Sequence, residues 1–240
     1  MSLLFKVKRK LYKAFHPAVG KIWMLHRCVT ERSTDDKQRV LEITPDFLES
    51  KILEYKSQGY HFISIDEAAN HIQNASPLFC RSKFLVVTFD DGYQDNLTMA
   101  LPILKKHNIP FVVYITTDFI DNHNEMWWYP NQHLALSMDE LLQLDAEPLC
   151  TIGAHTLSHP KLNELSPDDQ QKEIQDSKSK LESWLRHPVL HFSYPYGAHS
   201  DLTKQIAVQA GFSTIACAWG GPIRTDASIT NLSRIALKQE

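Results

Sequence analysis

Runs of consecutive apolar residues alternate along the chain with segments in which apolar residues recur every three or four positions. The clearest run is residues 84–89, where five apolar residues and a threonine follow one another without alternation. Such a run is typical of a strand buried on both faces of a parallel sheet. Further strands are predicted over residues 21–26, 60–63, 109–115, 151–155, 191–194, 213–218 and 235–237.

The segments between these strands carry signals for the beginning and end of helices. Thr44 and Pro45 supply an N-cap and a first-turn proline, and Gly59 supplies a glycine suited to end that helix. Capping boxes at Ser64 and Ser137 predict two further helix starts. Helices are also expected from about residues 97, 166 and 201, the first of them kinked at Pro102, while residues 30–43 and 118–136 are expected to be loops.

Polar side chains follow the ends of several predicted strands, and their distribution bears on the architecture. They are His26, Asp90, Asp91, His155 and Tyr196. Alternating strands and helices predict a parallel α/β domain with right-handed crossovers. In a (β/α) barrel the strand ends lie on one face, where active sites form, whereas an open doubly wound sheet gathers them along one edge. The barrel is favoured because these polar residues follow strands that are spread along the whole chain.

Residues 1–20 differ from the rest of the chain in their charge. Five basic residues between Lys6 and Lys13 lie among leucine, phenylalanine and tyrosine residues. A short basic amphipathic helix of this kind can lie on an anionic membrane surface, and a frayed or packed terminal segment is the alternative. Residues 21–240 contain no linker, repeat or low-complexity tract, and are expected to form a single barrel domain.

Composition and charge exclude several classes of protein. With 43% hydrophobic and 22% charged residues the chain has an ordinary globular composition, and a net charge of −3 leaves no basic footprint for nucleic acid. The basic start lacks the apolar core of a signal peptide, and nowhere do about eighteen apolar residues run together as a transmembrane helix requires. The four cysteines are scattered and form no C-x-x-C pair, so the expected location is the reducing cytoplasm.

Two groups of residues in this sequence suggest a metal centre. Burying the adjacent carboxylates of Asp90 and Asp91 is costly unless a partner or a metal compensates them, and a plain Asp-Asp-Gly turn is the alternative. His155 and His159 are four residues apart and can meet one cation, with surface or capping histidines as the alternative. One carboxylate would complete a site with open positions for water and substrate, as in catalytic metal centres.

Three motifs together resemble the signature of a known family. Residues 88–93 read Thr-Phe-Asp-Asp-Gly-Tyr, residues 155–160 contain His-x-x-x-His-Pro, and residues 194–197 read Tyr-Pro-Tyr-Gly. In this order they are similar to the polysaccharide deacetylases (NodB homology, carbohydrate esterase family 4), over about residues 22–237. The resemblance implies a distorted (β/α) barrel of about seven parallel strands. It also implies a divalent metal ion that is used to remove acetyl groups from N-acetylated, sometimes O-acetylated, glycans.

The resemblance also implies roles for individual residues. Asp90 matches the general base that deprotonates the attacking water, and Asp91, His155 and His159 match the metal ligands. Tyr196 matches the position whose backbone N–H helps to stabilise the oxyanion, and it is expected to contact the substrate. Zinc is the expected metal, with nickel, cobalt or iron as alternatives.

The chain departs from the family pattern at two places that matter for catalysis. Residues 191–197 lack the arginine that holds the catalytic aspartate, and Arg234 stands where the family carries its acid histidine. We therefore expect His26, at the end of the first strand, to protonate the leaving amine, and Arg234 or Arg27 to restrain Asp90. A hydrogen bond within the barrel mouth is the alternative role for His26.

The aromatic run at residues 127–129 can serve the same hypothesis. Trp128 is expected to stack on sugar rings, and a lid packed on the barrel is the alternative. The leading hypothesis is metal-dependent removal of acetyl groups from N-acetylhexosamine units of a polysaccharide or glycan precursor. Two alternatives stay open: a catalytically silent barrel that binds metal and carbohydrate, and a hydrolase of a non-sugar C–N bond such as a cyclic imide.

Overall fold

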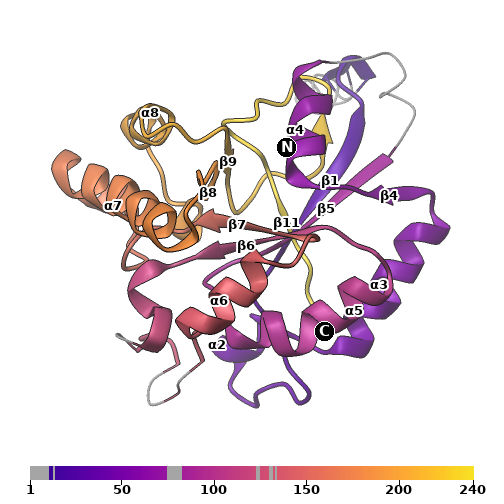
Figure 1. The fold of residues 1–240 in the computed structure, drawn as a ribbon. Coiled ribbons are helices and arrows are strands. Elements are labelled where there is room, and N and C mark those ends of the chain that lie inside the picture. Colours follow the sequence, from indigo (N-terminus) through magenta and orange to yellow (C-terminus); the bar gives the residue numbers. More distant parts are fainter. Residues whose placement is uncertain (1–10, 13, 75–82, 123–124, 130–131, 133) are drawn as a thin grey trace.

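A curled, mostly parallel sheet forms the centre of the molecule. The computed structural model describes residues 11–240, except residues 13, 75–82, 123–124, 130–131 and 133. The order across the described sheet is β10 (Ile223–Arg224), β1 (Ala18–Leu25), β5 (Lys83–Phe89), β6 (Phe111–Ile115), β7 (Cys150–Ala154), β8 (His191–Ser193) and β9 (Thr214–Ala216). Two further strands lie off this path. Strand β4 (Tyr60–Phe62) pairs with β5, and β11 (Ile235–Ala236) pairs with β1. All these pairs are parallel except β10 with β1. The sheet forms half of a barrel, and this confirms the predicted distorted (β/α) architecture (Figure 1).

Helices pack around this sheet. The longer ones are α3 (Pro45–Ser57), α4 (Ile65–Gln73), α5 (Leu101–Lys106), α6 (Met138–Asp145), α7 (Pro167–Leu185) and α8 (Asp201–Gln209). The short helical turns are α2 (Asp36–Arg39), η2 (Asn96–Ala100), η3 (Thr117–Asn122), η4 (Leu162–Glu164) and η5 (Pro195–Gly197). Figure 1 shows α3, α5 and α6 grouped below the sheet, α7 and α8 at its left flank, and α4 on the opposite side from α3.

The central strand β5 is buried on both faces, and this accounts for its unbroken apolar sequence. Leu85, Val87 and Phe89 belong to the larger core cluster, which includes buried residues of α3, α5, α6, α7 and α8. Phe84 and Val86 point to the other face, in a second cluster that includes residues of α4. Because successive side chains of a strand alternate between faces, two apolar layers require an apolar residue at every position.

The predicted helix signals have the expected geometry at several positions. The Thr44 side chain accepts a hydrogen bond from the Phe47 N–H, and Gly59 follows α3 with a φ of 78°. Ser137 and Glu140 form both bonds of a capping box at the start of α6. The break expected near Pro102 is a π-helical turn, η2, which precedes α5 and leaves the proline in the first turn of α5.

Residues 30–43 were expected to be a loop, and that prediction is wrong in part. They contain α2 and the short strand β3 (Glu42–Ile43), which pairs in parallel with β2 (Arg27–Cys28). The Asp35 side chain caps α2 by accepting from the N–H groups of Lys37 and Gln38. A single helical turn and a two-residue strand are too short for a hydrophobic period, so composition alone favoured a loop.

The amino-terminal segment can be compared with its prediction only in part. All five of its basic residues lie outside the described residues, so contact with a membrane stays a prediction. Strand β1 begins at Ala18, inside the segment that was expected to precede the barrel at residue 21. Among the helices that the structure describes, none has both the length and the apolar character needed to cross a bilayer.

The packing of α7 on the sheet provides a test of the fold. Ile174 is fully buried in the larger core cluster, whereas Val208 on α8 is 48% exposed. We expect Ile174→Ala to lower the free energy of unfolding by about 2–5 kcal/mol, because it removes buried methyl groups and leaves a cavity. Val208→Ala should change it by less than about 1 kcal/mol. Urea denaturation measures both, and equal effects of the two changes would contradict this placement of α7.

Candidate active site

The turn after β5 places two carboxylates at the mouth of the half-barrel. The Asp90 N–H still donates to the Leu25 carbonyl at 2.9 Å, which keeps Asp90 in register with β1. Asp91 then adopts a φ of 77°, a left-handed conformation that non-glycine residues seldom take. Both aspartates are almost fully buried, at 3% and 2% exposure. A buried pair of this kind requires compensation, and each carboxylate has a different partner.

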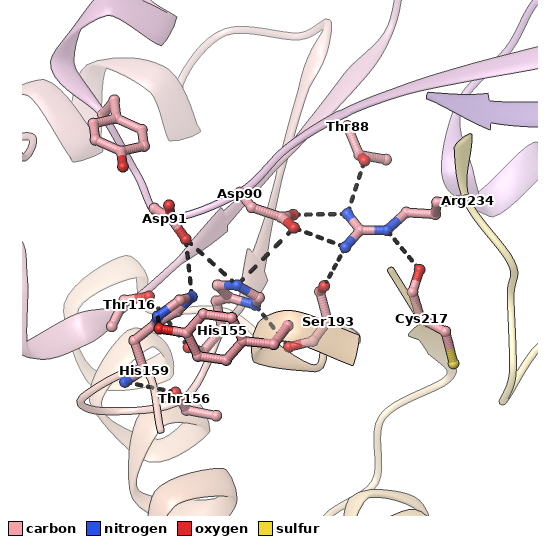
Figure 2. A network of polar contacts seen from close by, with 12 residues as sticks. Thr88, Asp90, Asp91, Thr116, His155, Thr156, His159, Ser193, Cys217 and Arg234 are labelled. Carbon is pink, nitrogen blue, oxygen red and sulfur yellow. Dashed lines mark hydrogen bonds and ion pairs between the residues drawn. The ribbon is translucent and has the colours of Figure 1, made fainter. Parts of the chain in front are cut away.

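Asp91 forms a cluster with two histidines (Figure 2). Its Oδ1 lies 3.5 Å from His155 Nε2 and 3.2 Å from His159 Nε2. Each of the three residues offers one atom that can bind a metal, and these three atoms lie within 4.8 Å of one another. This Asp91 oxygen is buried and has no hydrogen-bond donor among the described residues. Two imidazole nitrogens and a carboxylate oxygen are ligands that suit zinc and neighbouring divalent metals, so the cluster fits the divalent metal ion that the sequence resemblance implies.

His155 is oriented for such a role by a contact on its other ring nitrogen. Its Nδ1 lies 2.7 Å from the Ser193 carbonyl, and a carbonyl can only accept, so Nδ1 carries the proton. The Nε2 lone pair therefore faces Asp91, as in metal-binding histidines whose second nitrogen is bound by the protein. Burial lowers the pKa of His155 to about 4, which keeps the ring neutral near pH 7.

His159 lies on a loop that helix α7 holds in an unusual conformation. Thr156 and His159 both have left-handed φ angles, of 69° and 64°. The Glu173 carboxylate accepts from the N–H groups of Leu157 and Ser158 at 2.9 and 3.0 Å, and from the Ser158 hydroxyl at 2.6 Å. Glu173 was not identified from the sequence, because a glutamate on a polar helix face has no local signal for a contact with residues fifteen and sixteen positions earlier.

Asp90 is held by Arg234, from the segment that leads into β11. Nη1 and Nη2 of the guanidinium donate to the two carboxylate oxygens, both at 2.7 Å. The remaining donors reach Thr88 Oγ1 at 3.0 Å, Ser193 Oγ at 2.7 Å and the Cys217 carbonyl at 3.0 Å. Burial raises the pKa of Asp90, but the charge and hydrogen bonds of Arg234 together with the neighbouring histidines outweigh it, so that the net pKa is lowered and the carboxylate is ionised.

Arg27, the other arginine considered for Asp90, has different partners. Its Nε donates to Asp95 Oδ2 at 2.8 Å, and its Nη1 lies 3.5 Å from Glu42 Oε1.

Thr88 and Ser193 were not identified as partners of Arg234 from the sequence. Thr88 is the polar residue in the apolar run of β5, and its hydroxyl also donates to the Trp23 carbonyl at 2.7 Å. Thr88 lies inside a buried strand, and a buried hydroxyl requires a hydrogen-bond partner. Its position in the sequence could therefore have indicated a buried polar contact.

These groups line a cavity of about 350 Å³. His26, Asp90, Asp91, His155, His159 and Tyr196 line it, together with apolar side chains. Half-buried His26 directly follows β1, and its carbonyl accepts from Asn96 Nδ2 at 2.8 Å. Tyr196 has a left-handed φ of 58°, and its hydroxyl lies 3.1 Å from His159 Nδ1.

The aromatic run at residues 127–129 divides between the cavity and the protein interior. Trp127 and Trp128 line the cavity, and Trp127 is 67% exposed. The Trp128 ring lies 4.7 Å from the His159 ring, and its Nε1 donates to the Tyr93 hydroxyl at 2.6 Å. Tyr129 is fully buried and does not line the cavity. The structure thus places Trp127 and Trp128 at the cavity and Tyr129 in the interior, and stacking of Trp128 on a sugar ring stays a prediction.

The fold and the grouped residues are those of the NodB-homology class of proteins. The chain belongs to the polysaccharide deacetylase family, whose family model matches residues 80–215. This match confirms the resemblance that the three sequence motifs indicated. It covers Asp90, Asp91, His155, His159 and Tyr196, whereas His26 and Arg234 lie outside it.

Individual relatives agree with this assignment. YxkH of Bacillus subtilis is 28% identical over 178 residues, 74% of this chain and 59% of that protein. The chitooligosaccharide deacetylase of Azorhizobium caulinodans is 28% identical over 153 residues, 63% of this chain and 62% of that protein. The matched residues thus span about three fifths of these relatives. The solved structure of the Streptococcus pyogenes deacetylase PplD in complex with acetate has a TM-score of 0.77 and 25% identity, over 91% of this chain and 92% of that chain.

The contact between Glu173 and the His159 loop predicts a loss of metal affinity. We expect Glu173→Ala to weaken the binding of zinc or cobalt by about 10–100-fold, because the loop loses the carboxylate that holds three of its donors. Asp176→Ala on the same helix is the control, since its carboxylate pairs with Lys172 rather than with the loop. Isothermal titration with each metal measures both variants. Unchanged affinity in Glu173→Ala would contradict a role of Glu173 in orienting His159.

Proposed function

We propose that this chain is a metal-dependent hydrolase that removes acetyl groups from N-acetylhexosamine units of a polysaccharide or glycan precursor. The observation that carries the proposal is the bidentate contact between Arg234 and Asp90, beside the cluster of Asp91, His155 and His159. The third motif lacks an arginine and the last motif lacks its histidine, and these departures motivated the alternative of a catalytically silent barrel. Arg234 supplies the missing contact from another part of the chain, which supports the leading, catalytic hypothesis.

The proposed mechanism assigns a separate task to each carboxylate. A divalent metal ion held by Asp91, His155 and His159 would lower the pKa of a water molecule and polarise the acetyl carbonyl. Asp90, ionised and fixed by Arg234, takes the proton of the attacking water. The Tyr196 backbone N–H donates to the carbonyl oxygen as negative charge develops on it. Its left-handed conformation at the cavity supports this role.

The leaving amine requires a proton, and we assign its transfer to His26. Its side chain lies at the cavity, after the strand that pairs with β5, so that it shares the barrel mouth with Asp90. The protonated imidazole of His26 gives its proton to the amine, and the proton that Asp90 took from the attacking water returns to His26 through solvent. Trp128 forms an aromatic wall on which the apolar face of a sugar ring can pack.

The identity of the metal, the range of acetyl groups removed and the location of the protein are further parts of the proposal. We propose zinc as the metal, with nickel, cobalt or iron as alternatives, because all four accept imidazole and carboxylate ligands. Removal of O-acetyl groups would need no general acid as strong as the one that amide cleavage needs, and we include it as a second reaction. Cytoplasmic location and peripheral contact with a membrane stay predictions.

The role of Asp90 can be tested by measuring acetate release and metal content separately. We expect Asp90→Asn to reduce acetate release from N-acetylated chito-oligosaccharides by about 10²–10⁴-fold, because the general base is lost. The metal content, measured by elemental mass spectrometry, should stay at that of the unchanged protein. Asp201→Asn, at an exposed position on α8, is the control and should keep full activity. If the unchanged protein binds metal and releases no acetate from any acetylated glycan, a silent binding barrel becomes the better explanation.

The role of His26 can be separated from binding by changing the leaving group. An amine leaves only after protonation, whereas the phenolate of 4-nitrophenyl acetate leaves without it. We therefore expect His26→Ala to lower kcat on an N-acetylated glycan by about 10²–10⁴-fold, and to affect the activated ester far less. An equal loss on both substrates would assign His26 to another step, and no loss on either would remove it from the mechanism.

A further inference from the structure

A buried charged cluster lies below the cavity and is not used in the proposed mechanism. Arg27 stands between two carboxylates, with Nε 2.8 Å from Asp95 Oδ2 and Nη1 3.5 Å from Glu42 Oε1. The exposed fractions of these side chains are only 12% for Arg27, 11% for Asp95 and 4% for Glu42. Buried ion pairs of this kind add little net stability, because desolvation offsets the attraction, but they fix geometry.

The cluster holds one wall of the cavity through Glu42. Oε2 of Glu42 accepts from the Ser33 N–H at 2.5 Å, so that Glu42 links both ends of residues 33–42. Between these ends lies α2, and Lys37, Val40 and Leu41 of this segment line the cavity. The parallel pairing of β2 with β3 joins the same segment to Arg27 itself.

A second wall, the aromatic segment, is bound to the same residues. The Tyr129 hydroxyl donates to Glu42 Oε1 at 3.0 Å, and the Arg27 guanidinium lies 4.8 Å from the centre of the Tyr129 ring. Arg27 also lies 5.4 Å from the ring of Tyr93, whose hydroxyl accepts from Trp128 Nε1. Trp128 is thus connected to the cluster on both sides, through its neighbour Tyr129 and through Tyr93.

The third wall is the chain around His26. Oδ1 of Asp95 accepts from the Cys28 N–H at 2.9 Å. The adjacent Asn96 donates to the His26 carbonyl at 2.8 Å. The backbone from the His26 carbonyl to the Cys28 N–H is therefore held from the start of η2, through Asp95 and Asn96.

We propose that Arg27, Glu42 and Asp95 are positioning residues that hold three walls of the cavity in one arrangement and thereby set the affinity for substrate. The walls are residues 33–43, residues 127–129 and the end of β1 with His26. The cluster touches neither the Asp91–His155–His159 group nor Asp90 in any contact that the described residues show. Its link to the histidines runs only indirectly, through Tyr93 and Trp128, whose ring lies 4.7 Å from that of His159, so its main effect is expected on substrate binding. This inference rests on the proposed function for the identity of the substrate.

Glu42→Gln tests the inference with little change of shape. The amide oxygen can still accept one of the two hydrogen bonds, from the Ser33 N–H or the Tyr129 hydroxyl, but its NH2 group cannot accept the other, and the charge that faces Arg27 is lost. We expect KM for an N-acetylated glycan to rise roughly tenfold, the size of one coupling within a hydrogen-bonded network, with kcat and metal content within about threefold. Tyr129→Phe, which removes only the hydroxyl that reaches Glu42, should raise KM in the same direction.

Glu182→Gln is the matched control. Glu182 also accepts from a lysine and a backbone N–H, those of Lys178 and Val189, but it lies on α7 and does not line the cavity. Its replacement should leave KM unchanged even where it lowers the stability. If Glu42→Gln and Glu182→Gln affect KM equally, or if Glu42→Gln lowers only kcat, the positioning role is overturned.

Hydrogen exchange gives a reading that does not depend on activity. In both Glu42→Gln and Tyr129→Phe, amides of residues 33–43 and of residues 125–129 should exchange faster together, while residues 155–159 stay unchanged. Faster exchange confined to the segment that carries the substitution would contradict a shared anchor. A protein that releases no acetate would remove the proposed function, and the exchange experiment would still decide whether the cluster joins the two walls.

Discussion

The arrangement of the site depends on keeping two adjacent carboxylates ionised in a buried position. Asp90 and Asp91 are neighbours in the chain, so each adds to the cost of the other's charge. The left-handed turn at Asp91 directs their side chains to different main partners, and His155 Nε2 lies between them, 4.0 Å from Asp90 Oδ2 and 3.5 Å from Asp91 Oδ1. Arg234 pairs with Asp90, while Asp91 faces the two histidines (Figure 2). One local backbone conformation thus divides a repulsive pair into two groups with different chemistry.

The compensating charge for Asp90 comes from a position that the family pattern does not lead one to expect. An arginine on any strand that ends in the barrel mouth can bring its guanidinium to Asp90. The contact therefore fixes where the guanidinium must lie in space, but it does not fix the position of the arginine in the sequence. The five N–H groups of Arg234 have five acceptors among Thr88, Asp90, Ser193 and Cys217. A buried guanidinium with all its donors bound is rigid, and rigidity is what a general base requires of its support.

Much of the fold could be predicted because its signals are local. The apolar run of β5, the N-cap at Thr44 and the capping box at Ser137 each depend on residues within a few positions of one another. The prediction was wrong where the elements were too short for a period, as in α2 and β3. Strand β10 was also missed, since its two residues are recognisable only by their antiparallel pairing with β1.

The sequence by itself determined which residues could carry chemistry: a strand that ends in Asp90 and Asp91, two histidines four positions apart, and an arginine near the carboxyl-terminal end. Only the tertiary structure decided which of them meet. Arg234 and Asp90 are 144 positions apart in the chain. Glu173 lies on α7 but holds the loop that follows β7 and carries His159. Arg27 could not be distinguished from Arg234 by its sequence context, yet it pairs with Asp95 and Glu42. The physical reason is that side-chain partners in a buried site are chosen by where strands end in space, and strand order depends on contacts summed over the whole chain.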